Sequence, residues 1–190
     1  MSLVKLNHIH DLATLSEHKT VHQFLHHLPG PSVVHFDGDK RETRVITTLL
    51  HGNEPSGLKA LHRLLQAQFK PVFNTKFVIA SVTAAKTEPE FSHRMLPGKE
   101  DLNRCFGGAC KGVQEKLAES IRVNIGQWTP SFVIDIHNTS GSGPAFSVAT
   151  SDNENSVVLA SYFCQRQIVT DITLGSLMEC DFSCPTVTIE

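Results

Sequence analysis

Apolar and β-branched residues gather in short, nearly continuous runs along the chain. The clearest are TRVITTLL (43–50), KFVIASV (76–82) and SFVIDIHN (131–138). Runs of this length and composition are typical of strands buried in a mostly parallel sheet. Three further strands are expected at 31–37, at 145–150 and at CPTVTIE (184–190).

Helical spacing alternates with these strands. Residues 57–69 carry leucines at helical intervals, 113–125 is amphipathic, and two more helical segments are expected at 18–28 and 153–167. The order strand–loop–helix–strand predicts an α/β fold, with helices on both faces of a mostly parallel or mixed central sheet. The polar stretch 83–109 is longer than a structural connection needs, which indicates a functional loop.

Composition narrows the class of protein. The chain has 190 residues, enough for one core, and a net charge of −2, which gives no electrostatic case for nucleic acid or for an anionic membrane surface. We find no apolar run of about 18 residues and no secretory signal, so we expect a cytoplasmic protein. Five cysteines without CxxC spacing favour reduced thiols.

Candidate metal ligands follow two of the predicted strands. His51 and Glu54 come directly after the strand 43–50, and His137 ends the strand 131–138. In open α/β sheets, ligands bind outside the carboxyl ends of the strands. Two histidines and a glutamate with an open position form a known catalytic zinc set. Taken singly, Glu54 could instead complement a helix dipole, and His137 could be a satisfied buried histidine.

Two other groups have partial metal-ligand spacing. His22 and His26 lie at i, i+4 on a predicted helix, but a solvated helix face is the simpler interpretation. Cys180 and Cys184 could supply half a site, but no second pair closes a tetrahedron.

Three blocks, in order, resemble a known family. HGNEPSG (51–57), DLNRCFGG (101–108) and DIHNTSGSG (135–143) are similar to the signatures of the succinylglutamate desuccinylase/aspartoacylase family, which is related to the zinc carboxypeptidases. The resemblance implies a zinc carboxypeptidase-like catalytic domain over residues 1–190, with one Zn²⁺ per chain. It also implies that the smaller C-terminal β domain of the family is absent from this sequence.

The resemblance also implies roles for individual residues. His51, Glu54 and His137 match the zinc ligands, and Asn103 with Arg104 matches the pair that grips a substrate carboxylate, for which a planar guanidinium is suited. Arg94 is a candidate for steadying the oxyanion.

Two acidic residues complete the expected site. Asp135 is a candidate acceptor that orients a ligand imidazole, or else a buried strand-end carboxylate. Glu190 matches the catalytic glutamate that would activate the zinc-bound water. Because Glu190 is the last residue, the sequence leaves open whether it is native or starts an added tail. The match of the six preceding residues favours a native residue.

The chain departs from the family in places. The middle strand lacks the usual Asn-Pro, and LMECDFSCP (177–185) has none of the basic residues that aspartoacylase places before its glutamate, so N-acetylaspartate is a poor specific guess. The sequence therefore predicts a zinc-dependent deacylase of small N-acyl amino acids. A peptidase, an esterase and a non-catalytic metal-binding domain remain as alternatives, and the oligomeric state is not predicted.

Overall fold

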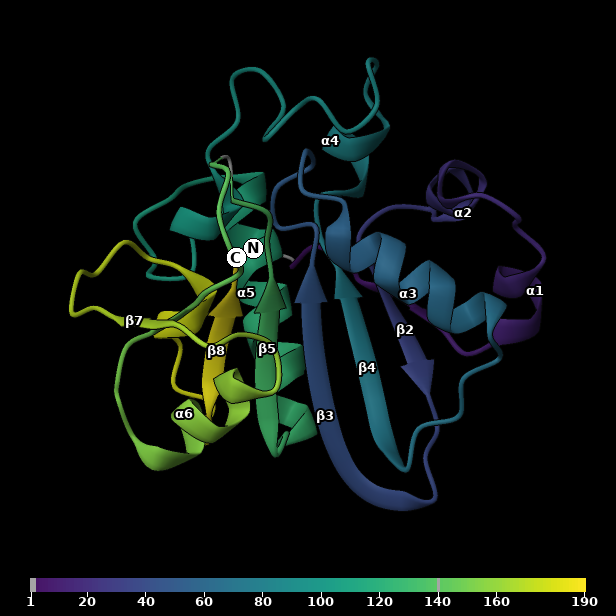
Figure 1. Ribbon diagram of the computed structural model, residues 1–190. Helices are drawn as coiled ribbons and strands as arrows, with labels where there is room; N and C mark the ends of the chain where they lie inside the picture. The colour runs from purple at the N-terminus through teal and green to yellow at the C-terminus, as the bar shows by residue number, and fades with distance from the viewer. Residues whose placement is uncertain (1–2, 140) are drawn as a thin grey trace.

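One mixed sheet organises the chain. The computed structural model describes residues 3–139 and 141–190, in which eight strands pair in the order β1-β2-β4-β3-β5-β8-β6-β7 (Figure 1). Neighbouring strands are parallel except for β2 with β4 and β6 with β8. The expected α/β architecture is confirmed. The strands are β1 (Asn7–Ile9), β2 (Ser32–Phe36), β3 (Lys40–Thr48), β4 (Phe73–Ile79), β5 (Phe132–Ile136), β6 (Ser147–Ala149), β7 (Gln167–Val169) and β8 (Thr186–Ile189).

Helices cover both faces of this sheet. They are α1 (Leu12–Ser16), α2 (Val21–His27), α3 (Ser56–Gln66), α4 (Val82–Lys86), α5 (Val113–Trp128) and α6 (Glu154–Ser161), with two 3₁₀ turns, η1 (Leu102–Arg104) and η2 (Leu177–Glu179). Within the described ranges, no helix combines the length and apolar character that a membrane span requires.

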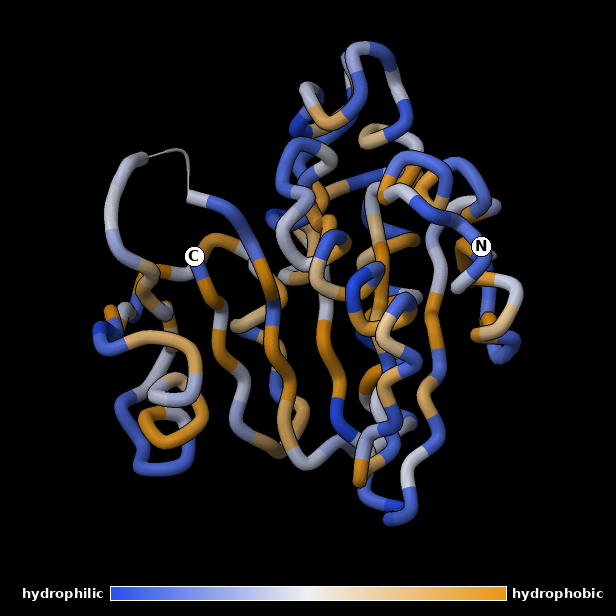
Figure 2. The backbone as a smooth tube through the Cα atoms, turned by 45° about the vertical axis from the view of Figure 1, so that its right-hand side comes forward, coloured by the Kyte–Doolittle hydropathy of each residue, from blue (hydrophilic) through white to orange (hydrophobic). Residues whose placement is uncertain are grey.

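The core lies in layers between the sheet and these helices. Along β3, Val45 packs in the cluster of α5, whereas the next residue, Ile46, packs against the cluster of α1, α2 and α3. Along β5, Val133 likewise packs in the cluster of α5. The next residue, Ile134, packs in a third cluster, which includes Leu159 of α6. Figure 2 shows the apolar residues concentrated along the central strands. This alternation follows from the two-residue period of a strand, which sends successive side chains to opposite faces.

Four details differ from the sequence prediction. β1 lies before the helix expected at 18–28, where no strand was predicted, and α4 interrupts the expected loop 83–109. The helix expected at 153–167 ends at Ser161, and β7 follows it. These short elements depend on tertiary partners: β1 pairs with β2, and β7 with β6.

The expectation of reduced cysteines is wrong for one pair. Cys105 and Cys110 form a disulfide, because the chain turns back on itself across the intervening glycines and brings the two sulfur atoms together. The remaining three, Cys164, Cys180 and Cys184, are free thiols.

Candidate metal centre and active site

The candidate residues gather where three adjacent parallel strands end. β3, β5 and β8 are neighbours, and Thr48, Ile136 and Ile189 stand in register at their carboxyl ends. His51 and Glu54 follow β3, His137 follows β5, and Glu190 follows β8. Parallel strands carry their carboxyl ends to one edge, so the topology itself collects these side chains.

Two glycines of the HGNEPSG block allow the loop after β3 to fit closely. A Cβ on Gly52 would lie 2.6 Å from the carbonyl oxygen of His93, and one on Gly57 would lie 2.2 Å from Oγ1 of Thr48. Leu49, fully buried, adopts a positive φ of 57° as the chain leaves the strand. This tight turn places His51 and Glu54 on the same side of the loop.

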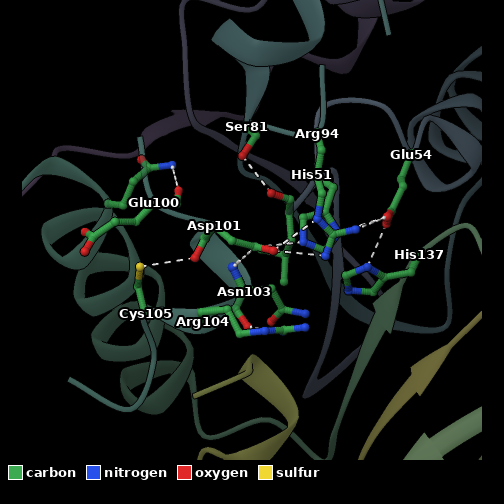
Figure 3. A network of polar contacts seen from close by, with 12 residues as sticks. His51, Glu54, Ser81, Arg94, Glu100, Asp101, Asn103, Arg104, Cys105 and His137 are labelled. Carbon is green, nitrogen blue, oxygen red and sulfur yellow. Dashed lines mark hydrogen bonds and ion pairs between the residues drawn. The ribbon is translucent and has the colours of Figure 1, made fainter. Parts of the chain in front are cut away.

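His51, Glu54 and His137 converge on one point (Figure 3). Nδ1 of His51 lies 2.9 Å from Oε1 of Glu54, and Nδ1 of His137 lies 2.7 Å from Oε2. One ligand atom from each of the three residues lies within 4.8 Å of the others, and all three side chains are buried. Two imidazoles and one carboxylate suit a divalent ion such as zinc.

The far side of each imidazole is held by a carboxylate. Nε2 of His51 donates to Oδ1 of Asp101 at 2.9 Å, and Nε2 of His137 donates to Oδ2 of Asp135 at 2.7 Å. Asp135 is fully buried and also accepts from Oγ1 of Thr47 at 2.5 Å. Such carboxylate–histidine pairs fix the ring orientation and leave Nδ1 to face the metal. Each ring therefore has an aspartate at Nε2 and presents Nδ1 to the point where an ion would bind, which fits a metal site.

Asp135 stands where the sequence suggested, whereas Asp101 was not singled out. The sequence signal that could have identified Asp101 is its position as the first residue of the DLNR block. The contact with His51 spans 50 residues, so no local pattern reveals it.

The opposite charges of the three candidate ligand residues shift their pKa values toward the ionised forms. Burial lowers the pKa of His137, but the charge and hydrogen bond of Asp135 and those of Glu54 outweigh it and raise that pKa to about 10. Burial likewise opposes ionisation of Glu54, yet hydrogen bonds from His137 and His51 lower its pKa to about 2. At His51 as well, burial lowers the pKa, but hydrogen bonds to Asp101 and Glu54 outweigh it and raise that pKa. A metal ion bound at this point would displace any proton on the two Nδ1 atoms.

Arg94 reaches the same centre from the long loop. Its Nε and Nη2 donate to Oδ2 of Asp101 at 3.1 and 3.0 Å, and its Nη1 lies 3.4 Å from Oε1 of Glu54. The side chain is 41% exposed, so it borders the cavity without being enclosed. Burial raises the pKa of Asp101, but hydrogen bonds from His51 and Arg94 reverse the effect and keep that pKa well below its usual range.

Asn103 and Arg104, on η1, line the same cavity as the candidate metal ligands. Oδ1 of Asn103 accepts from the backbone N–H of Leu177 at 3.0 Å, and Nη1 of Arg104 donates to the carbonyl oxygen of Asn103 at 2.7 Å. The Asp101 side chain caps the turn through the Asn103 N–H at 2.9 Å. The DLNR block thus builds one rigid corner of the site.

Glu190 closes the opposite wall. Its backbone exchanges two hydrogen bonds with Phe146, at 2.8 and 3.2 Å, which fixes the residue at the end of β8. The side chain lines the cavity but lies outside the ligand group. Burial raises the pKa of its carboxyl, against the opposing charge of His137.

One cavity joins these residues. Its volume is about 620 Å³, and its lining includes the predicted ligands, Arg94, Asn103, Arg104 and Glu190, together with Asn53, Asn138, Thr139, Phe146, Val148, Leu174, Ser176, Met178 and Thr188. Asp135 is not part of the wall and acts only through His137.

The other candidate groups lie elsewhere. Both His22 and His26 contact the carboxylate of Glu90, which ties α2 to the long loop, so their helix face is not simply solvated. In residues 3–139 and 141–190, Cys180 and Cys184 belong to no ligand group. A second group, Glu100 with Cys105 and Cys110, has its two sulfur atoms joined in the disulfide.

Solved structures share this fold at low identity. A succinylglutamate desuccinylase from Chromobacterium violaceum superposes with a TM-score of 0.66 at 14% identity, over 80% of this chain and 55% of that protein. One from a Silicibacter species gives 0.62 at 21%, over 83% and 51%. A metallo-carboxypeptidase from Pseudomonas aeruginosa gives 0.60 at 14%, over 83% and 50%. The chain therefore spans about half the length of these proteins.

Sequence comparison identifies the family. No curated protein matches the chain by sequence. A family model, the succinylglutamate desuccinylase/aspartoacylase catalytic domain, matches residues 41–169. That region holds all three signature blocks and every predicted site residue except Glu190, whose position rests on the end of β8 alone. Because the family model matches more than half of the chain, the chain belongs to the succinylglutamate desuccinylase/aspartoacylase family.

Proposed function

We propose that this chain is the catalytic domain of a zinc-dependent hydrolase that cleaves the amide bond of an N-acyl amino acid. The observation that carries the proposal is the convergence of two imidazoles and one carboxylate, with one ligand atom of each within 4.8 Å of the others, in a cavity that two arginines and a separate glutamate also line. Family membership supports hydrolysis as the reaction class.

His51, Glu54 and His137 would hold the ion. Zinc bound there would polarise the scissile carbonyl and lower the pKa of water. Asp101 and Asp135 keep each imidazole in the tautomer that has its proton on Nε2, because a carboxylate can only accept at that position.

Arg104 and Asn103 would anchor the substrate. The Arg104 guanidinium offers two parallel N–H donors to a carboxylate, and η1 fixes it beside the ligand group. When the substrate carboxylate is anchored, the scissile amide is held in line with the attacking water, which lowers the entropic cost of the reaction. Arg94, released from its 3.4 Å contact with Glu54, would donate to the oxygen that becomes negative.

Glu190 would act as the general base. Its carboxylate takes one proton from the attacking water and returns it to the leaving nitrogen, so that the products are a carboxylic acid and a free amine. A pKa raised by burial suits this exchange, because it brings the proton affinity closer to the working pH.

A Glu190→Gln variant tests this assignment. We expect zinc content to stay near one ion per chain and turnover of N-acyl amino acids to fall at least about a hundredfold. Glu154→Gln, at an exposed position on α6, is the matched control and should change neither quantity. Full turnover in a zinc-loaded Glu190→Gln protein would show that another group is the base.

The same cavity is compatible with two neighbouring activities, cleavage of a terminal peptide bond or of an ester. Hydrolysis of a panel of N-acyl amino acids, N-succinylglutamate among them, compared with that of short peptides and of matched esters, separates these activities from deacylation. Bound zinc without turnover of any acyl compound would favour a non-catalytic metal-binding domain. The substrate is proposed to be a small molecule, with no nucleic acid or membrane partner. A cytoplasmic location is proposed as well; the three free thiols support it, and the Cys105–Cys110 disulfide argues against it.

A further inference from the structure

The cavity offers one uncompensated positive charge. Its two arginines differ, because Arg94 is paired with Asp101 and Glu54, whereas Arg104 forms no ion pair within the described part of the chain and donates only to a backbone carbonyl. Two carboxylates, Glu54 and Glu190, also face the cavity. Among the described residues of the lining, Arg104 alone carries a positive charge without a carboxylate partner, so the cavity offers one such partner to a substrate carboxylate.

Four apolar side chains line the same cavity and are called its apolar wall. Phe146 precedes β6 and Val148 lies in it, while Leu174 precedes η2 and Met178 lies in it. Ser176 and Thr188, beside them, add two hydroxyl groups to the lining. The segment that carries Leu174 is attached to η1 and the residues after it, because the N–H of Phe106 donates to the carbonyl oxygen of Gly175 at 2.9 Å. The wall is thus fixed relative to the corner that carries the free guanidinium.

Another arginine lies nearby but outside the cavity. Arg166 lines a separate depression with Gly143, Pro144 and Ile168, which shares only Thr139 and Phe146 with the site. It is therefore not counted among the cations that meet a substrate at the metal ligands.

We propose that the cavity selects N-acyl amino acids that carry a single carboxylate and are otherwise apolar, and that it disfavours dicarboxylates. This inference rests on the proposed deacylase function and narrows its substrate class. A second carboxylate placed against the apolar wall would lose part of its hydration without meeting a cation, which is unfavourable. An apolar group of the same shape would gain from burial instead. Succinylglutamate, the compound in the names of several solved relatives, carries three carboxylates.

Two isosteric substrate pairs test the proposal with the zinc-loaded chain. N-acetyl-L-leucine and N-acetyl-L-aspartate differ on the amine side, and N-(4-methylpentanoyl)glycine and N-succinylglycine differ on the acyl side. In each pair, methyl groups replace carboxylate oxygens at nearly constant shape. We expect kcat/KM for the monocarboxylate to exceed that for the dicarboxylate at least about tenfold.

A charge added to the wall should reverse this preference. Leu174→Arg changes a cavity residue that is 47% exposed and is expected to fold, and Ile172→Arg, two residues away, 61% exposed and outside the cavity lining, is its matched control. Leu174→Arg should raise the dicarboxylate-to-monocarboxylate ratio at least about tenfold, whereas Ile172→Arg should leave it unchanged. Val148→Arg provides a second, independent position on the same wall.

The outcomes separate the two claims. A dicarboxylate preferred in either pair, or a ratio that both cavity variants leave unchanged, would overturn the inference while the deacylase function stands. If no compound is hydrolysed, the proposed function fails, and calorimetric binding of the same four compounds decides the inference. Tighter binding of both monocarboxylates supports it, and equal or weaker binding overturns it.

Discussion

Replacing Asp101 with asparagine should weaken metal binding through His51. The carboxylate accepts from Nε2 of His51 at 2.9 Å and from Arg94 at 3.0 and 3.1 Å. Asparagine keeps the shape and, with its amide oxygen in the place of Oδ1, the cap of η1. The bond from His51 then ends on a neutral acceptor and is about half as strong. The amide NH₂ takes the place of Oδ2 and can no longer accept from Arg94. The single bond to His51 accounts for about 1–2 kcal/mol of metal affinity, or about a 5- to 30-fold rise in Kd.

A competition titration with a chromophoric zinc chelator measures this change. Asp181→Asn serves as the control, since the exposed Asp181 carboxylate only accepts from the N–H of Ser183 at 2.8 Å. Thermal unfolding of the metal-free proteins verifies that both variants are folded. If Asp101→Asn binds zinc as tightly as the parent, the carboxylate does not orient His51, and our account of its role is refuted.

Three further predictions concern the scaffold. Gly57→Ala should destabilise the chain by about 1–3 kcal/mol in urea unfolding, whereas Gly126→Ala, in open space on α5, should stabilise it by about 0.5–1 kcal/mol. Burial and Lys76 lower the pKa of His35 to about 3, so the unfolded chain takes up a proton below pH 6.5 that the folded chain refuses. The contribution of His35 to the unfolding free energy should therefore fall by about 1–2 kcal/mol from pH 7 to pH 5, measured as the difference between the parent and His35→Gln at the two pH values. Denatured, unreduced protein should titrate three thiols, and five after reduction of the Cys105–Cys110 bond.

Each of these has a clear contrary result. A neutral Gly57→Ala would mean that the loop after β3 has room to relax. An identical pH slope in His35→Gln would assign the acid sensitivity to other groups. Five thiols titrating before reduction would show that the disulfide does not form in solution.

The sheet was largely predictable because its central strands are buried on both faces. The runs at 43–50, 76–82 and 131–138 became β3, β4 and β5, each within a few residues of the expected bounds. β1 and β7 have only three residues each and owe their conformation to a neighbouring strand. Pairing of this kind depends on tertiary contacts, which a local pattern of three residues does not encode.

The site was predictable where chemistry coincides with strand ends. His51, Glu54 and His137 follow buried strands directly, so their convergence could be expected from topology. Asp101 and the disulfide at Cys105 arise instead from the path of the loop 83–109, which composition does not determine. The sequence could also not show that Arg94 is neutralised and Arg104 is not, because that difference depends on distances of 3–4 Å.

Diffraction from zinc-soaked crystals, recorded at the zinc absorption edge, tests the central claim most directly. The anomalous difference map should contain one strong peak per chain, about 2.0–2.1 Å from Nδ1 of both His51 and His137 and within bonding distance of the Glu54 carboxylate. A map with its strong peak elsewhere, for example near Glu100, or with none at these residues despite zinc bound in solution, would contradict the account.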